Sequence, residues 1–554
     1  MIAATRRALL PATILVVGLA AAAQADLLRY QTAIRSLGNG TANFRSVDAR
    51  PTLDAANPAR AFAGGSFTVG FQIGPDPFSA VRSLNARDGI LVGFTRNPNT
   101  KGWDVDWSLA VGCEDGNALI NDVVIRYDGI LLVGGTFEGE ATFEREGRPP
   151  LELIAPTRSA SFIALADPDS GEWLDAFVVP GMTLRSMDVD DRGEIFVTGP
   201  GSLARRYSAE FQQLWDIRPP DGTSSLDHIA VSSDRENPFV YVQGTFSRQG
   251  NDLDVFVVQL DRGNGNTRWN TRISSEGGHD ERAGGIGIGP LGNLRVAVSS
   301  DGADLSVANT PIRNKPDPDI DARHGHLLFL NAGDGNLLND QILGRATEQG
   351  GILETQNLDI DYAGNTYVSV SFTGSYQFKG VVHPGREDAA VVVVDARGTP
   401  MRFMDSNGEA GAIGLDVAVV DRDLQVLTGT MRGTTEELFG ESPLQPSAVN
   451  KAFLAVLDKP DDQDAYIITP ATPDQELGPL IQAINRAEGE VYRVIDRPQR
   501  NIRLIAADLT TEQVNSLLQA GASVADASLG GLGGCPFAAP PSWPPWGPAS
   551  PAPH

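Results

Sequence analysis

Short apolar runs alternate with turn-forming residues along most of the chain. The phrase "NDVVIRYDGILLVGGTF" (121–137) places two apolar runs on either side of an Asp-Gly turn, and similar phrases return at 227–246, 357–374 and 415–431. β-Branched and aromatic residues fill the runs, while Gly, Asn and Asp supply the positive φ angles of tight hairpins. The pattern predicts antiparallel strands joined by short turns.

Two kinds of strand pair alternate and together form a repeated four-stranded unit. The second kind is clearest in "DVFVVQLDRGNGNTRW" (254–269). Units start about 45 to 70 residues apart, which brackets the period of propeller blades. Copies of the first kind lie near Val123, Met187, Ile229, Ile286, Ile360 and Val417.

The two ends of the repeat region each carry half a unit. Ala59–Gly70 matches a first half alone, and Asn450–Asp458 matches a second half alone. A split unit is what ring closure requires, because the N-terminal segment then completes the last sheet and leaves no open edge. The sequence therefore predicts a mainly β protein with a seven-bladed β-propeller over residues 26–458, with six or eight blades as alternatives.

A different pattern follows the charged linker 459–464. Predicted strands over 465–471, 490–496, 501–509 and 522–529 alternate with predicted helices over 474–489 and 510–521. The order β-α-β-β-α-β over 465–529 predicts a small α+β, ferredoxin-like domain. Residues 530–554 are rich in Gly and Pro, which predicts a disordered tail.

The N-terminus has the features of a secretory signal peptide. Arg6 and Arg7 precede an apolar run over 8–23, and a small-residue site predicts cleavage after Ala25. The run is short for a membrane span, although an uncleaved anchor is the alternative. We therefore expect residues 1–25 to be removed, no membrane span afterwards, and an extracellular or periplasmic location. Cys113 and Cys535 are then available for a disulfide, and the sequence leaves their pairing open.

The net charge of -26 narrows the choice of partners. So acidic a chain repels phosphate backbones and anionic lipid surfaces, which argues against a nucleic-acid partner. The same charge also serves solubility. Acidity therefore excludes one class of partner without identifying another.

Acidic turns are the main candidates for a metal site. Asp188, Asp190 and Glu194 crowd carboxylates as calcium loops do, and residues 317–325 and 359–365 do so less fully. None of the three segments supplies a complete set of calcium ligands at fixed offsets. The simpler interpretation is a hairpin turn whose Asp accepts hydrogen bonds from its own backbone.

Other side chains are weaker candidates for a functional site. His324 and His326 alternate on one predicted strand, and a solvated strand face is the simpler interpretation of this pair. Trp173, Trp215 and Trp269 recur at matching positions, which favours packing between blades over a carbohydrate platform. The sequence has no Gly-x-Ser-x-Gly elbow with triad partners.

The repeats resemble the SBBP-type bacterial β-propeller repeat, whose pattern is roughly D-A-F-V-A-K-L-D, G-x-x-x-W and I-A-V-D-x-x-G-N-x-Y-V-x-G-x-F. The resemblance covers 59–458 and is clearest at 254–269 and 359–374. Members of that family are mostly exported proteins without a shared activity. The resemblance thus implies a fold and a location rather than a function.

The C-terminal segment resembles the I9 propeptide inhibitor domain of subtilisin-like proteases. The residues that carry it are Tyr466 to Ile468, Val491-Tyr492, "IRLIAADLTTEQVNSLLQAG" (502–521) and Val524. The resemblance implies a domain that caps a protease cleft with the chain after its last strand. Here that chain is "GGLGG" (530–534), which differs from a product-like segment.

Three functions follow from these patterns. The favoured hypothesis is a secreted, non-catalytic scaffold or binding protein that uses the propeller to contact a protein or ligand. The alternative is an inhibitor or chaperone of a subtilisin-like protease, acting through the I9-like domain. A propeller enzyme would need two acids on neighbouring inner strands, which the sequence alone does not place.

Overall fold

The protein's structure is a computed structural model that divides the chain into two compact units, Leu28–Lys459 and a second unit that includes Pro460–His554. It describes residues 29–37, 40–50, 58–73, 87–97, 102–113, 116–219, 223–232, 238–247, 252–290, 292–361, 363–406, 411–421, 424–433, 437–439, 442–444, 447–458, 463–469, 490–497, 502–510 and 523–526. The predicted signal peptide and tail lie outside these residues, as do positions 459–462 of the predicted linker, whose last two residues, Gln463 and Asp464, are part of a strand.

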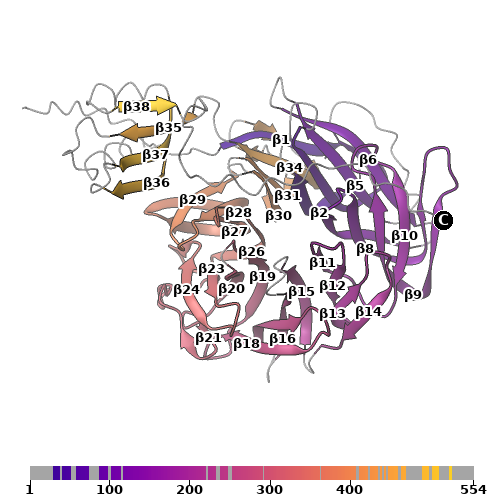
Figure 1. The fold of residues 1–554 in the computed structure, drawn as a ribbon, viewed down its shortest axis with the longest axis horizontal. Coiled ribbons are helices and arrows are strands. Elements are labelled where there is room, and N and C mark those ends of the chain that lie inside the picture. The colour runs from indigo at the N-terminus through magenta and orange to yellow at the C-terminus, as the bar shows by residue number, and fades with distance from the viewer. Residues whose placement is uncertain are drawn as a thin grey trace, which may run out of the picture. The chain divides into compact units, whose positions relative to one another are not determined.

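The first unit is a ring of antiparallel sheets, shown in Figure 1 from indigo to orange. One four-stranded sheet contains β11 (Ser186–Val189), β12 (Ile195–Gly199), β13 (Ser202–Tyr207) and β14 (Gln213–Ile217). The next contains β15 (Thr223–Val231), β16 (Phe239–Ser247), β17 (Leu253–Asp261) and β18 (Thr267–Ser274), extended by β21 (Ser306–Val307) and β22 (Thr310–Pro311). A third contains β19 (Glu281–Ile288), β20 (Leu294–Ser300), β23 (His324–Leu330) and β24 (Leu337–Ile342).

Two further sheets continue the ring. The first contains β26 (Ile352–Ile360), β27 (Thr366–Phe378), β28 (Val381–Val394) and β29 (Pro400–Asp405), with β25 (Arg345–Ala346) at the edge of β27. The second runs in the order β30 (Gly411–Asp421), β31 (Leu424–Gly433), β34 (Ser447–Asp458), β1 (Arg29–Leu37) and β4 (Gln72–Ile73). A small hairpin, β32 (Glu437–Phe439) and β33 (Ser442–Leu444), lies between β31 and β34 in the chain.

The remaining strands of the ring form one eight-stranded sheet. It joins β2 (Ala42–Arg50), β3 (Arg60–Thr68), β5 (Arg87–Arg96) and β6 (Trp103–Cys113) to β7 (Ala118–Ile125), β8 (Leu131–Phe143), β9 (Leu151–Ala166) and β10 (Trp173–Val179). The two halves merge because the end of β6 pairs with the end of β8, from Val111 opposite Phe143 to Cys113 opposite Ala141.

The propeller prediction is confirmed in its architecture, but the predicted count of seven separate blades is wrong. Apart from the hairpin of β32 and β33, hydrogen bonds among the described residues of the first unit give five sheets of four to six strands and one of eight. The difference arises at a single place. β8 extends far enough past its own hairpin to pair with β6, so two repeats share one sheet.

The strand that closes the ring is not the predicted one. Ala59–Gly70 was expected to complete the last sheet, but β3 lies in the eight-stranded sheet between β2 and β5. The closing strand is β1, which pairs antiparallel with β34 from Arg29 opposite Asp458 to Arg35 opposite Phe453. The prediction failed because β2, an unrecognised strand, already supplies the partner that β3 needs.

Tryptophans join neighbouring sheets, as predicted. Trp269 on β18 donates its indole N–H to the carbonyl of Ala332, in the turn between β23 and β24, at 3.0 Å. Trp215 makes the equivalent bond to Arg262 at 3.0 Å, and Trp173 is fully buried. Gly335 lies under the Trp269 ring with φ of 72°, and a Cβ there would come within 2.8 Å of the ring. The repeated Gly and Trp of the sequence thus meet across a sheet boundary.

The second unit contains a four-stranded antiparallel sheet. Its order is β36 (Glu490–Arg497), β37 (Ile502–Thr510), β35 (Gln463–Thr469) and β38 (Ser523–Asp526). A β-α-β-β-α-β sandwich has this strand order, because each helical crossover skips one strand position. Both predicted helices fall outside the described residues. No helix in the described part of the chain is long and apolar enough to cross a membrane.

The pairing of β1 with β34 predicts the effect of removing β1. A chain that starts at Gly40 should lose about 3–6 kcal/mol of unfolding free energy relative to one that starts at Leu28, because each lost backbone hydrogen bond contributes about 1 kcal/mol. Thermal unfolding of the two chains measures the difference. Equal midpoints would show that β34 does not need β1.

The contact between Gly335 and Trp269 predicts a second effect. Gly335→Ala should lower the unfolding free energy by about 2–4 kcal/mol, because it adds a clash with Trp269 and Thr271 to the cost of a left-handed backbone. Gly129→Ala is the matched control, since Gly129 has φ of 87° and nothing within 4 Å of an added Cβ. Equal losses in urea unfolding would contradict the packing role.

Candidate functional site

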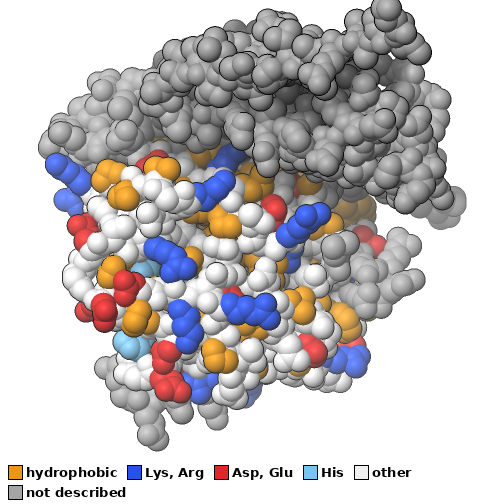
Figure 2. Space-filling view, turned by 90° about the vertical axis from the view of Figure 1, so that its left-hand side faces the viewer, with side chains coloured by type: hydrophobic (Ala, Val, Ile, Leu, Met, Phe, Trp, Pro, Cys, Tyr) orange, Lys and Arg blue, Asp and Glu red, His pale blue; other side chains and the backbone are white. Residues whose placement is uncertain are grey.

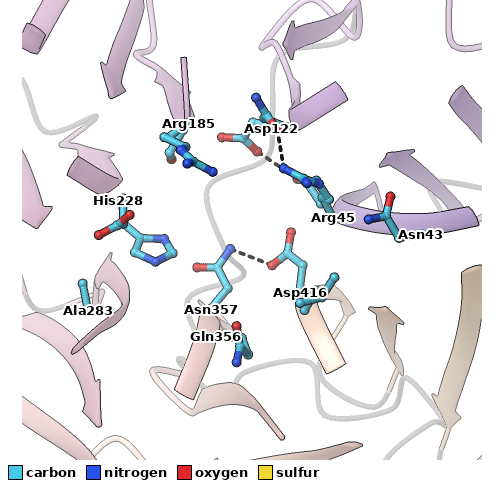
Figure 3. Close-up of a pocket in the computed structure, with 14 residues that line it drawn as sticks. Asn43, Arg45, Asp122, Arg185, His228, Ala283, Gln356, Asn357 and Asp416 are labelled. Carbon is cyan, nitrogen blue, oxygen red and sulfur yellow. Dashed lines mark hydrogen bonds between the residues drawn. The ribbon is translucent and has the colours of Figure 1, made fainter. Parts of the chain in front are cut away.

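A polar pocket of about 370 Å³ lies at the centre of the ring (Figure 3). Its wall is built by the first strand of each repeat, namely β2, β7, β11, β15, β19, β26 and β30. The side chains that line it are Asn43, Arg45, Ser46, Asn121, Asp122, Arg185, Ser186, Asp227, His228, Ala283, Gln356, Asn357, Leu415 and Asp416. Ligand sites favour such positions, where several elements converge on one concave surface.

Aspartate carboxylates link the strands that surround the pocket. Asp188 on β11 accepts the N–H of Val189 with one oxygen and the N–H of Val231 on β15 with the other, both at 2.7 Å. A carboxylate suits this role because its two oxygens accept several hydrogen bonds at once. The same bridge runs from Asp48 to Ile125, Asp122 to Met187, Asp359 to Val419 and Asp416 to Val47, at 2.6–2.8 Å.

At the two remaining junctions, neutral side chains on β16 and β20, the second strands of their sheets, reach the next inner strand. Gln243 accepts the N–H of Gly285 at 3.1 Å, and Ser299 accepts the N–H of Thr355 at 2.8 Å. Backbone N–H groups that face a neighbouring strand are therefore satisfied all around the pocket. The bridges fix the inner strands, and so the pocket wall, in place.

Burial changes the acidity of the bridging carboxyls. It raises the pKa of Asp48 and Asp188 to about 7 and that of Asp122 and Asp359 to about 6, although backbone hydrogen bonds act in the opposite direction. Burial also raises the pKa of Asp416. Perturbed carboxyls of this kind are found both in catalytic sites and in structural networks.

Two of these acids, Asp122 and Asp416, line the pocket, but both are engaged by the chain. Asp122 accepts hydrogen bonds from Ser46, Val123 and Met187 at 2.6–2.9 Å. Asp416 accepts three more from Asn357, Val417 and Val47, at 2.7–2.8 Å. They come from β7 and β30, between which β2 lies. These contacts favour a structural role over acid–base catalysis.

The predicted calcium ligands do not point toward a common centre. Asp188 bridges two strands, and Glu194 forms an ion pair with Arg206 at 2.6 Å. Asp190 accepts the N–H groups of Arg192 and Glu194, both at 2.9 Å, as in the hairpin-turn interpretation. Its other oxygen lies 3.1 Å from Arg262. Calcium would have to displace these contacts, and its binding remains an untested prediction.

The histidine pair is placed differently from the prediction. His324 and His326 lie on β23 and are buried, at 2% and 0% exposure, instead of on a solvated strand face. Burial, together with the nearby His324 and Arg345, lowers the pKa of His326 to about 3. The apolar residues of the adjoining sheets cover β23 from both sides, which the short sequence phrase could not reveal.

Cys113 is buried, and its thiol lies 2.7 Å from the backbone carbonyl of Glu138. Burial raises the pKa of this thiol. Cys535 lies outside the described residues, so the disulfide between Cys113 and Cys535 remains a prediction. Ala25, the predicted cleavage site, lies outside them as well.

Sequence reasoning missed one acidic cluster. Carboxylate oxygens of Asp252, Asp254 and Glu281 lie within 4.8 Å of one another, beside a pocket of about 630 Å³ that Asp252 and Arg272 line. Arg272 pairs with Asp254 at 2.6 Å, and burial raises the pKa of Glu281 to about 8. An arginine and a protonated acid together balance most of the charge. In the sequence, only Asp254, the first residue of "DVFVV", gave a signal for this cluster.

The outer surface gives no stronger candidate on the side of the ring that carries β24 and β29. Figure 2 shows basic, acidic and hydrophobic side chains interspersed over that face. Isolated apolar side chains such as Val381 and Leu338 are 58% and 45% exposed, which is ordinary for a protein surface. The central pocket therefore remains the best candidate site.

Comparisons with known proteins give little more. No family model matches the chain, and no curated protein matches it. Neither the SBBP-type nor the I9 resemblance therefore gains support.

Solved structures similar to the chain include three with identities of 9–12%. The C-terminal WD40 domain of Sif2 has a TM-score of 0.38 over 75% of this chain and 97% of that chain. BamB from Moraxella catarrhalis has 0.37 over 78% and 99%, and a protein of unknown function from Bacteroides caccae has 0.24 over 44% and 89%. Likenesses this weak carry no argument, so the fold rests on the strand pairing described above.

The raised pKa values predict a pH dependence. Asp48 and Asp188 have folded pKa values of about 7, whereas an unfolded Asp has about 3.9, so the folded state binds more protons between these values. Their contribution to unfolding free energy is full below about pH 4 and is lost as the pH rises through 7. The melting temperature should therefore fall less between pH 5 and 8 in a variant with Asp48→Asn and Asp188→Asn.

Other titrating groups, such as His326, are present in both chains, so their effects on the melting temperature cancel in this comparison. Asp319→Asn on the exposed surface is the control and should leave the wild-type profile unchanged. Parallel profiles of the wild type and the double variant would contradict the raised pKa values.

Proposed function

We propose that the chain is an exported, non-catalytic binding protein that uses the ring as a rigid scaffold and its central pocket as the binding surface. The observation that carries the proposal is the convergence of seven successive inner strands, six of which contribute polar side chains, on one pocket of about 370 Å³. A ligand there would contact most of the ring at once. Rigid walls lower the ordering cost of binding.

The contacts of the acids support binding over catalysis. A general acid or base needs an oxygen that can reach the substrate. Asp122 and Asp416 instead use both carboxylate oxygens for hydrogen bonds that hold the inner strands. The export part of the proposal rests on the pattern in residues 1–25.

The protease-directed alternative has less support. The strand order of the C-terminal sheet is compatible with an I9-like domain, but many unrelated functions use the same sandwich. The chain that would enter a protease cleft, 530–534, lies outside the described residues. Among the described residues nothing favours inhibition, so the pocket is the better basis for a function.

Filling the pocket tests the proposal. Small polar metabolites, screened by thermal shift against the full chain, should include ligands that stabilise it by about 2.7 kcal/mol at one hundred times Kd. Ala283→Trp should abolish the shift, since Ala283 lines the pocket, whereas Leu338→Trp on the outer strand β24 should retain it.

The same experiment separates binding from catalysis. Ligands should be recovered unchanged by mass spectrometry after incubation with the wild type. Turnover that Asp122→Asn or Asp416→Asn abolishes would replace the binding proposal with an enzyme. N-terminal sequencing of secreted protein, expected to begin at Asp26, checks the export part.

A further inference from the structure

Two arginines in the central pocket lack an acidic partner. Arg45 lies on β2 and Arg185 directly precedes β11, and Figure 3 shows both side chains reaching into the pocket. Arg45 donates to the side-chain oxygen of Asn121 at 2.9 Å. In the described part of the chain, no carboxylate forms an ion pair with either guanidinium.

Unpaired guanidinium groups are unexpected in so acidic a chain. It has 70 acidic and 44 basic residues, and many of its other arginines pair with acids, as Arg205 does with Asp216 and Arg206 with Glu194. Arg45 is partly buried, and such a charge without an acidic partner loses hydration without gaining an ion pair. The pocket therefore holds positive charge that the fold itself does not use.

The acids of the pocket cannot serve as partners without breaking the ring. Asp122 and Asp416 each accept three hydrogen bonds, two from other strands and one from the next residue of their own strand. Asp227 accepts a hydrogen bond from Ser225. Among the described residues, the carboxylates of the pocket are thus engaged by other groups of the chain, and a bound anion would supply the negative charge that the two guanidinium groups lack.

The two arginines also affect each other. Burial lowers the pKa of Arg45, and the positive charges of Arg185 and Arg87 lower it further. An anion between Arg45 and Arg185 would relieve this repulsion. Burial likewise lowers the pKa of His228, which keeps its imidazole neutral at pH 7 and able to donate one N–H to an anion.

We propose that the pocket binds a small organic molecule through an oxyanion, a carboxylate or phosphate, which is held between Arg45 and Arg185. Guanidinium groups match both anions because their N–H donors form planar, paired hydrogen bonds. His228 and Gln356 line other parts of the same pocket and would contact the neutral part of the ligand (Figure 3). The inference rests on the proposed function, since it specifies the ligand of that pocket.

Calorimetric titration of the full chain tests the proposal with three probes at low ionic strength and pH 7. Citrate supplies carboxylates, inorganic phosphate supplies the other oxyanion, and sorbitol is the neutral control. At least one of the two anions should bind and sorbitol should not. The stronger of the two anions then identifies which oxyanion the pocket prefers.

Charge-removing variants locate the site. Arg45→Gln and Arg185→Gln should each weaken anion binding about tenfold or more, because a hydrogen bond to a charged group is lost in a confined pocket. Arg192→Gln, on the exposed turn between β11 and β12, should change binding by less than about twofold. Arg185 is exposed to the pocket, so its variant remains informative if Arg45→Gln destabilises the fold.

The outcomes separate the two proposals. Anion binding that is unchanged in Arg185→Gln overturns the oxyanion inference, as does the failure of both anions to bind. If a neutral ligand binds and Ala283→Trp abolishes that binding, the pocket function stands while the oxyanion inference falls. If neither the probes nor the metabolites bind, both proposals fail.

Discussion

Antiparallel pairing between β1 and β34 is the interaction on which the ring depends. The two strands are separated by about the whole length of the repeat region, yet they pair over residues 29–35 and 453–458. The pairing covers the outer edge of β34, which would otherwise expose a row of unsatisfied backbone groups. Lys451 adds to it by donating to the carbonyl of Gly40 at 2.8 Å. The central pocket exists only because this closure brings β30 back beside β2.

Inside the closed ring, aspartate carboxyls hold neighbouring strands together. Carboxylates bridge five of the junctions between inner strands, and burial makes them weak acids. Groups with perturbed pKa values are often taken for catalytic residues. Here the contacts of these carboxyls indicate a structural cause for the raised pKa values. Each carboxyl is buried because it accepts a backbone N–H of a neighbouring strand. The two arginines are the opposite case, since their charge has no use within the described fold.

At the outer part of the ring, aromatic packing joins the sheets. The indoles of Trp215 and Trp269 lie over turns of the next sheet, where Gly265 and Gly335 adopt positive φ. Gly is required there because it tolerates that backbone and leaves room for the ring. The Gly-x-x-x-Trp spacing in one repeat therefore serves two different sheet boundaries.

Local pattern alone determined most strands from β3 onward, the hairpin turns, the propeller architecture and the interpretation of Asp190 as a turn residue. These follow from side-chain alternation and turn chemistry, which act over a few residues. It could not locate the closing strand, because β1 pairs with β34, at the far end of the repeat region, and local pattern does not report pairing over such a distance. The local pattern also could not distinguish the role of Asp188, which bridges two strands, from the role of Asp190, which accepts hydrogen bonds within a turn.

Only the tertiary structure decided which side chains share the pocket. Arg45, Arg185 and His228 are far apart in sequence, and nothing in their neighbours distinguishes them from solvated charges. The burial of His324 and His326 was equally hidden, since it depends on sheets that pack from both sides. A chain's local pattern fixes which elements form, whereas the closing of the ring fixes which of their side chains face each other.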